Sequence, residues 1–310
     1  GFFVSLLVHR RGLAGMVRHR LRRLGLPFVV FWPPLFAASA LLGLAFLHRM
    51  AHGTWGLDRS LMPQSTTATT GPNTMHLCFL WMLVWLAMLT PLLWAAVRAL
   101  PASLQHALGR IVAWLGGTPL GIVVLTLPLA WIGAGYDHGV VTPNGSFLPP
   151  LAEWLHNGLF YGFGLCLYAQ QKALMARYEK HWPVRAGLGL VCFLITAVLS
   201  EVLAQPEASA FALVLVTGAF ADILAAPVAA TRHLQFWMAL AYNCASWLWS
   251  LALIGFFLRH VAQARAWLAY LADSSYWVYL VHLPMTSGWG ALLHGLPIPV
   301  QAKMLINVLA

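Results

Sequence analysis

Residues 24–47 read LGLPFVVFWPPLFAASALLGLAFL, an apolar run without a single charged side chain. As a helix rising about 1.5 Å per residue, this run is long enough to cross the roughly 30 Å hydrocarbon layer of a bilayer. The chain of 310 residues is 60% hydrophobic and 8% charged, whereas soluble domains are about 25% charged. The sequence therefore predicts an all-α, polytopic transmembrane helical bundle that forms a single domain over residues 1–310.

Other mostly apolar segments of similar length follow along the chain. They lie at residues 75–97, 112–134, 151–169, 186–203, 208–226, 236–258 and 275–293, after a short apolar stub at 1–8. The chain opens and stops within apolar runs. We therefore expect the domain to be incomplete at both ends, with at least one membrane helix missing at each end.

The charged residues predict the orientation in the membrane. Lys and Arg number 18 against 8 Asp and Glu, and six of the arginines lie between residues 10 and 23 with no acid among them. By the positive-inside rule, this stretch is a cytoplasmic loop. Seven full crossings then follow a partial first helix, and segment 208–226, which Gly218 and Asp222 interrupt, is re-entrant or peripheral on the outer side. The basic charge thus indicates a lipid bilayer as partner and no nucleic acid.

The four cysteines carry no metal-binding or disulfide pattern. Cys78, Cys166, Cys192 and Cys244 all fall within apolar segments and form no C-x-x-C pair. The sequence therefore predicts no metal site and no disulfide framework.

A polar stripe interrupts the last apolar segment. Ser275, Tyr279 and His282 stand at i, i+4 and i+7, which places them on one helical face while Val278 and Val281 point elsewhere. Polar groups at membrane depth are costly unless they face a cavity or a partner. The stripe is either a buried histidine bonded to a neighbouring helix or the polar wall of an active-site tunnel.

His76 stands at the outer start of a predicted crossing, where Asn73 or Thr74 could cap the helix. An interfacial histidine among aromatic residues is often only an anchor. An imidazole there is also suited to general acid/base catalysis. On the catalytic interpretation, His76 converges with the polar stripe on one cavity.

Arg20 and Arg23 are three residues apart, just before the first membrane entry. Two guanidinium groups on one helical face can hold phosphates through bidentate bonds. The alternative is that they are topogenic charges attracted to anionic lipid.

Four sequence pieces occur together in this order: GFF at 1–3 with the basic stretch and RLRRLGLP at 20–27, HLCFLW at 76–81, LFYGFG at 159–164, and YLADSSYWVYLVHLP at 270–284. In this combination the chain resembles the acyltransferase 3 family, and within it the glucans biosynthesis protein C type. The likeness spans nearly the whole chain.

The resemblance implies a multi-pass enzyme of the bacterial inner membrane. It would move a succinyl or acetyl group from a cytoplasmic acyl-CoA, with no permanently bound cofactor, to a hydroxyl of a periplasmic or cell-surface glycan. It assigns Arg20 and Arg23 to donor binding and His76, Ser275, Tyr279 and His282 to catalysis. The family's first membrane helix, with the histidine usually regarded as catalytic, would precede Gly1.

Two other functions fit the same residues. A membrane transporter or flippase for a glycolipid or an anionic substrate could line its path with the polar stripe and the basic mouth. A membrane O-acyltransferase of unrelated fold would keep the chemistry and change only the architecture. Release of CoA distinguishes both enzymes from the transporter.

Overall fold

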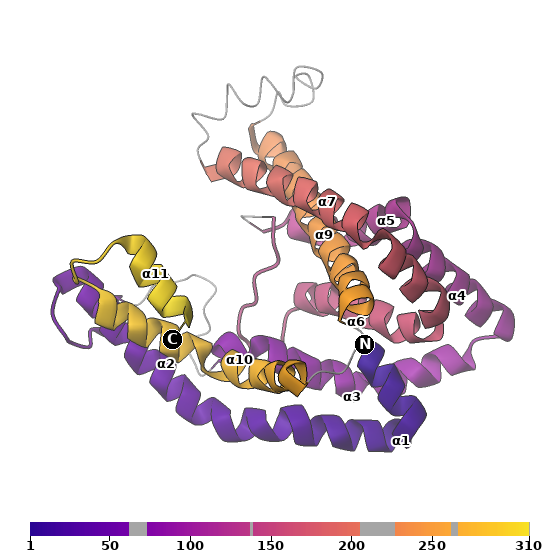
Figure 1. Cartoon of the computed structure of the whole chain (residues 1–310), viewed down its shortest axis with the longest axis horizontal. Helices are drawn as coiled ribbons and strands as arrows, with labels where there is room; N and C mark the ends of the chain where they lie inside the picture. The colour runs from indigo at the N-terminus through magenta and orange to yellow at the C-terminus, as the bar shows by residue number, and fades with distance from the viewer. Residues whose placement is uncertain (62–72, 137–138, 205–226, 262–265, 310) are drawn as a thin grey trace. The chain divides into compact units, whose positions relative to one another are not determined.

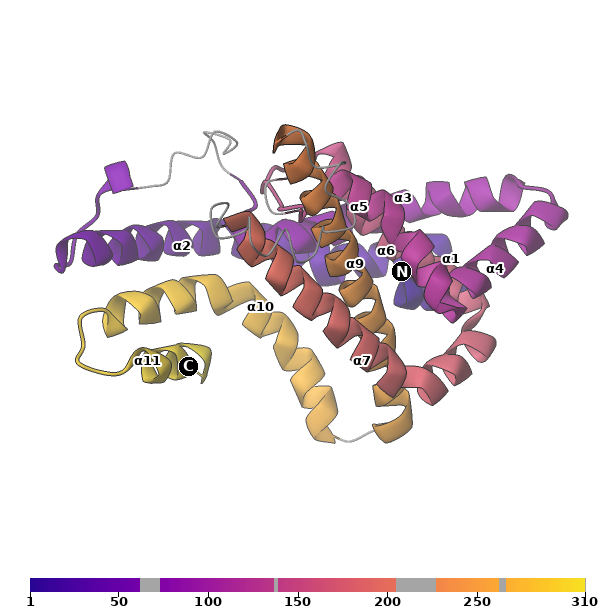
Figure 2. The same cartoon turned by 90° about the horizontal axis from the view of Figure 1, so that it is seen from above.

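The computed structural model describes residues 1–61, 73–136, 139–204, 227–261 and 266–309, and every regular element in them is helical (Figures 1 and 2). The elements are α1 (Phe2–Arg20), η1 (Leu21–Gly25), α2 (Leu26–His52), η2 (Arg59–Leu61), η3 (Met75–Leu77), α3 (Cys78–Ala99), α4 (Ala102–Gly117), α5 (Pro119–Gly133), α6 (Leu151–Ala169), α7 (Gln171–Ala204), α9 (Pro227–His260), α10 (Ala266–Leu293) and α11 (Val300–Leu309). The all-α prediction is confirmed.

Four helical stretches are long and apolar enough to cross a membrane: Phe2–His52, Met75–Ala99, Gln171–Ala204 and Arg232–His260. A fifth arises if the bent pair α4 and α5 counts as one span. These stretches confirm a multi-pass membrane protein. The described residues hold fewer candidate spans than the seven crossings that we predict. Polar residues lower the mean hydropathy of α6 and α10, so these two helices are not among the candidates. Glu153 and Asn157 lie in α6, and Asp273 lies in α10.

The predicted cytoplasmic loop at residues 10–23 is wrong in its conformation. This stretch belongs to α1, which bends at Gly12 (φ 71°, ψ 172°), and to η1, a π-helix whose last turn is closed by a bond from the Leu26 N–H to the Leu21 carbonyl. Arginine and leucine are good helix formers. The stretch contains no proline before Pro27. A basic segment is therefore not necessarily a loop.

The predicted segment 112–134 is broken rather than continuous. Thr118 is extended (φ −121°, ψ 149°) between α4 and α5, which meet at 99°. A residue before proline avoids the helical region, and Pro119 follows. The Thr118 hydroxyl accepts a bond from the Gly121 N–H at 3.0 Å and caps α5. Local chemistry thus ends one helix and starts the next.

The chain packs as two compact units. Unit 1 comprises Gly1–Met16, Leu89–Thr142 and Pro150–Gln263, and unit 2 comprises Val17–Met88, Pro143–Pro149 and Ala264–Ala310. Both α1 and α3 are shared between the units. One domain over residues 1–310 stays a prediction.

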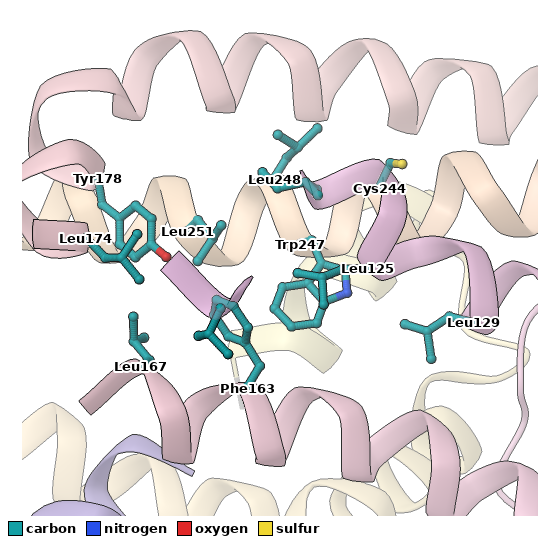
Figure 3. Close-up of a cluster of buried hydrophobic side chains, with 12 residues drawn as sticks. Leu125, Leu129, Phe163, Leu167, Leu174, Tyr178, Cys244, Trp247, Leu248 and Leu251 are labelled. Carbon is teal, nitrogen blue, oxygen red and sulfur yellow. The ribbon is translucent and has the colours of Figure 1, made fainter. Parts of the chain in front are cut away.

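The core of unit 1 lies between α4, α5, α6, α7 and α9. Figure 3 shows its buried side chains, among which Phe163, Tyr178 and Trp247 are aromatic. Trp247 stacks on Phe160 with ring centroids 4.3 Å apart. This core consists almost entirely of apolar contacts.

Helices α7 and α9 lie side by side and antiparallel. Gly189 of α7 faces Trp249, and a Cβ at Gly255 of α9 would lie 2.1 Å from the Tyr178 carbonyl oxygen. Only glycine permits this close approach. The antiparallel pairing places the end of α7 and the start of α9 at the same end of the pair. Segment 208–226, for which we predict a re-entrant or peripheral position, lies outside the described residues.

Unit 2 has a smaller core between α2, the first half of α3 and α10. It contains the buried residues Leu24, Phe28, Leu77, Leu80, Val84 and Leu280. Phe28 stacks on Trp81 with centroids 4.8 Å apart. All six predicted site residues belong to this unit.

Candidate functional site

The segment before His76 is held by hydrogen bonds to a second loop of unit 2. The N–H and the hydroxyl of Thr74 both donate to the Gly145 carbonyl, at 2.7 and 2.8 Å. Gly145 adopts φ +72°, a conformation that favours glycine. The Asn73 side chain accepts from the Met75 N–H at 2.9 Å. Of the two capping candidates, Asn73 therefore bonds the entry to η3, while Thr74 ties the entry to the 145 loop.

His76 donates from Nε2 to the carbonyl oxygen of Leu280 on α10, at 2.8 Å. In a regular helix, the Leu280 carbonyl would accept from the backbone four residues on. That residue is Pro284, which has no N–H. Proline therefore leaves a free acceptor inside α10, and the imidazole of His76 satisfies it. Because a carbonyl only accepts, the proton of His76 lies on Nε2, and Nδ1 is a buried nitrogen without a hydrogen-bond partner in the described residues.

Tyr279 completes a reciprocal pair of bonds between the two helices. Its hydroxyl donates to the His76 carbonyl at 2.7 Å. The two rings lie 6.4 Å apart. Each residue thus donates from its side chain to the backbone of the other helix, which fixes the start of α3 against the middle of α10.

His282 lies next to this pair. Its Nδ1 donates to the Tyr279 carbonyl at 2.7 Å, so its Nε2 carries the lone pair. The His282 ring meets the His76 ring edge to face, with centroids 5.1 Å apart. His282 is exposed, unlike the half-buried His76 and Tyr279. It is therefore the most accessible side chain of the trio.

Ser275 does not join the trio. It is exposed, and its hydroxyl donates to the Ala272 carbonyl at 2.7 Å. Ser275 does not line the groove that His282 lines, and a catalytic role for it stays a prediction. His282 lines this groove of about 850 Å³ with Val278 and Val281, the residues that we expect to point elsewhere. Tyr279 and Leu280, by contrast, contact η3 and α3.

The two arginines differ in environment. Arg20 is half-buried at the end of α1, whereas Arg23 is exposed in η1. A π-helix has more residues per turn than an α-helix, so residues three apart lie further apart around its axis. Arg23 Nη2 lies 3.6 Å from Asp273 Oδ1, and both side chains are exposed, at 67% and 78%. An acid therefore partly compensates the proposed phosphate site.

Three residues near the trio carry contacts that the sequence did not predict. Pro284 frees the carbonyl to which His76 bonds, and Gly145 accepts both bonds of Thr74. The Phe147 carbonyl accepts from the indoles of Trp81 and Trp85, at 2.6 and 3.2 Å. Only Pro284 leaves a signal in the sequence, since a proline inside an apolar segment always frees the carbonyl four residues before it.

These features define a helical multi-pass membrane protein with a histidine and tyrosine site at one helix contact. A model of the acyltransferase 3 family, described as an acyltransferase domain, matches residues 1–310. The chain belongs to this family and is a membrane acyltransferase. No curated protein and no solved structure matches it. The glucans biosynthesis protein C type stays a prediction.

Proposed function

We propose that the chain forms part of an O-acyltransferase of the bacterial inner membrane. It transfers a succinyl or acetyl group from a cytoplasmic acyl-CoA to a hydroxyl of a periplasmic or cell-surface glycan. The observation that supports this most is the state of His282. Its Nδ1–H is bonded to the Tyr279 carbonyl, and its ring is exposed, so Nε2 is an available base.

The chemistry assigned to His282 is a proton transfer. The hydroxyl oxygen of the acceptor attacks the thioester carbonyl carbon while His282 Nε2 takes the hydroxyl proton. The tetrahedral intermediate then expels the CoA thiolate, to which the imidazolium returns the proton. His76 and Tyr279 act as positioning residues, because their polar atoms are bonded to the backbone of the opposite helix.

The donor enters from the arginine end of unit 2. The pair Arg23 and Asp273 lies nine residues before His282 along α10, about 13 Å at the rise of an α-helix. Phosphates held by Arg20 and Arg23 at the cytoplasmic surface would leave the thioester free to extend along α10. Ser275 lies between these points and has no assigned role in this proposal.

The alternative is a transporter or flippase for a glycolipid or an anionic substrate. It would use the exposed His282 and the groove only as a path. No separate observation favours this alternative. It predicts that substrate moves without release of CoA.

The test is an assay of the full-length protein in proteoliposomes with acyl-CoA outside and a neutral glucan oligosaccharide inside. Acyl transfer releases free CoA, which a thiol reagent measures, and adds the mass of the acyl group to the oligosaccharide. His106→Ala, on the exposed face of α4, is a matched control that should keep this activity. Movement of labelled oligosaccharide with no release of CoA would instead establish the transporter.

A further inference from the structure

The groove beside His282 has a chemistry of its own. It runs along α10 from Val278 to Leu293, about 22 Å at the rise of an α-helix. Helix α11 forms its second wall, and the Asn307 amide donates to the Thr286 carbonyl at 3.3 Å. This groove is longer than the roughly 15 Å of hydrocarbon that one leaflet of a bilayer provides, so it can hold an extended acyl chain of a lipid.

The middle of the groove offers few free donors to a ligand. The Thr286 hydroxyl donates to the Leu283 carbonyl at 3.0 Å, and His282 Nδ1 donates to Tyr279. What remains is mainly aliphatic surface from Val278, Val281 and Met285 on α10 and from Met304 and Val308 on α11. A sugar would leave its hydroxyl groups unpaired on such a surface, whereas a hydrocarbon chain would not.

One end of the groove is cationic. Lys303 and His294 line it, and the Arg49 guanidinium donates to the His294 carbonyl at 3.3 Å. The described acids of unit 2 are Asp58, which accepts from Ser60, and Asp273, which pairs with Arg23. Neither of them lines the groove. The Lys303 ammonium therefore has no acidic partner there.

We propose that this groove binds an anionic phospholipid of the outer leaflet. The lipid phosphate pairs with Lys303 at the cationic end, and one acyl chain lies along Val278, Val281 and Met285. The positive-inside rule assigns the arginine end of α10 to the cytoplasm, so Lys303 lies toward the outer surface. The bound chain lies beside His282 and forms a lipid wall at that side of the site.

The proposal is tested by native mass spectrometry of the full-length protein in detergent, titrated with phosphatidylglycerol or with phosphatidylcholine of the same acyl chains. The wild-type protein should retain phosphatidylglycerol at least fivefold better. Lys303→Gln should abolish this difference, and Lys303→Arg should keep it. Lys172→Gln, which removes an exposed lysine of α7 in unit 1, is the matched control and should change nothing.

A second variant probes the apolar wall. Met285→Trp fills the groove and should reduce the retention of both lipids, with circular dichroism as the check on folding. Equal retention of phosphatidylglycerol by wild type and Lys303→Gln would overturn the proposal. A dimer that Met285→Trp dissociates would show that a second copy, not a lipid, covers the groove. Because the readout is binding, failure of the acyltransfer proposal leaves this result interpretable.

Discussion

The two units hold their helices together in different ways. Unit 1 relies on apolar packing, with Trp247 and Tyr178 buried among leucines and with glycines that let α7 and α9 approach closely. Unit 2 has a smaller apolar cluster, and side chains of one element bond the backbone of another, as His76 does to Leu280 and Trp81 does to Phe147. Helices in lipid associate through close packing and through interhelical hydrogen bonds. Unit 1 has such bonds as well, for example between the Thr90 and Tyr161 hydroxyls at 2.6 Å, but its larger core is apolar. Unit 2 has the smaller core and depends more on hydrogen bonds where its histidines meet.

The largest effect is expected from His282→Ala in unit 2, which should change activity and not stability. Loss of a general base typically lowers a rate by about 10²- to 10⁴-fold. The variant should lose acyl transfer to this extent while it inserts normally, because His282 is exposed and its only bond in the described residues is to its own helix. CoA release in proteoliposomes measures the loss. Activity within twofold of wild type would remove His282 from the mechanism.

The corresponding change in unit 1 should act on stability. Leu251 is 2% exposed in the unit 1 core, and truncation of a buried leucine to alanine costs about 2–5 kcal/mol. Leu251→Ala should lower the unfolding temperature of the detergent-solubilised protein. Leu253→Ala is the matched control on the same helix, since Leu253 is 47% exposed and leaves no cavity. If the two variants melt together, the cluster of unit 1 is not the stabilising core.

Patterns of hydropathy predict the position of the apolar helices in both units, although not all of their ends and breaks. Segment 151–169 coincides with α6 although Glu153 and Asn157 lie in it, because a mostly apolar run has one favourable conformation in lipid. The break at Thr118 was also encoded locally, in the Thr-Pro pair that follows two glycines. The helical arginine stretch was not predicted, because charge patterning reports the side of the membrane and not the backbone conformation.

The site was predictable only in part, for a physical reason. Polar side chains are costly at membrane depth, which predicts that His76, Tyr279 and His282 have polar partners. In the structure these three residues contact one another. Their partners are backbone carbonyls, which every residue has and which no sequence pattern marks. Ser275 bonds only within α10 in the described residues, because a helical stripe gives an angle around the axis and not the distance to the next helix. The groove requires α11 to fold back on α10 through the short connection between Leu293 and Val300, and hydropathy does not report the direction of that turn.

Pro284→Ala sharpens the comparison by restoring a regular helix in unit 2. The new N–H at position 284 would bond the Leu280 carbonyl and displace His76 Nε2. Acyl transfer should fall about tenfold although α10 gains helix propensity, since proline costs about 3 kcal/mol in a helix interior. Pro91→Ala in α3 is the matched proline control.

A double-mutant cycle separates positioning from general damage. Once Pro284→Ala has released His76, the further change His76→Ala should cost little, so the two losses should not add. His76→Gln keeps an N–H for the Leu280 carbonyl and should retain more activity than His76→Ala. Additive losses would show that Pro284 and His76 act separately.

The smallest expected effect concerns the charge pair at the other end of α10. Asp273 competes with any phosphate for Arg23, but an exposed ion pair contributes only about 0–1 kcal/mol. Asp273→Asn should therefore lower the KM for acyl-CoA by up to about fivefold and leave kcat unchanged, and added salt should reduce this gain because it screens exposed charges. Asp58→Asn, one residue before η2, is the control acid. The pair Arg20→Lys and Arg23→Lys keeps the topogenic charge but removes both guanidinium forks, so it should raise the same KM. If neither the Asp273 variant nor the lysine pair changes the KM, these arginines serve only to orient the chain toward anionic lipid, and donor binding must be sought elsewhere.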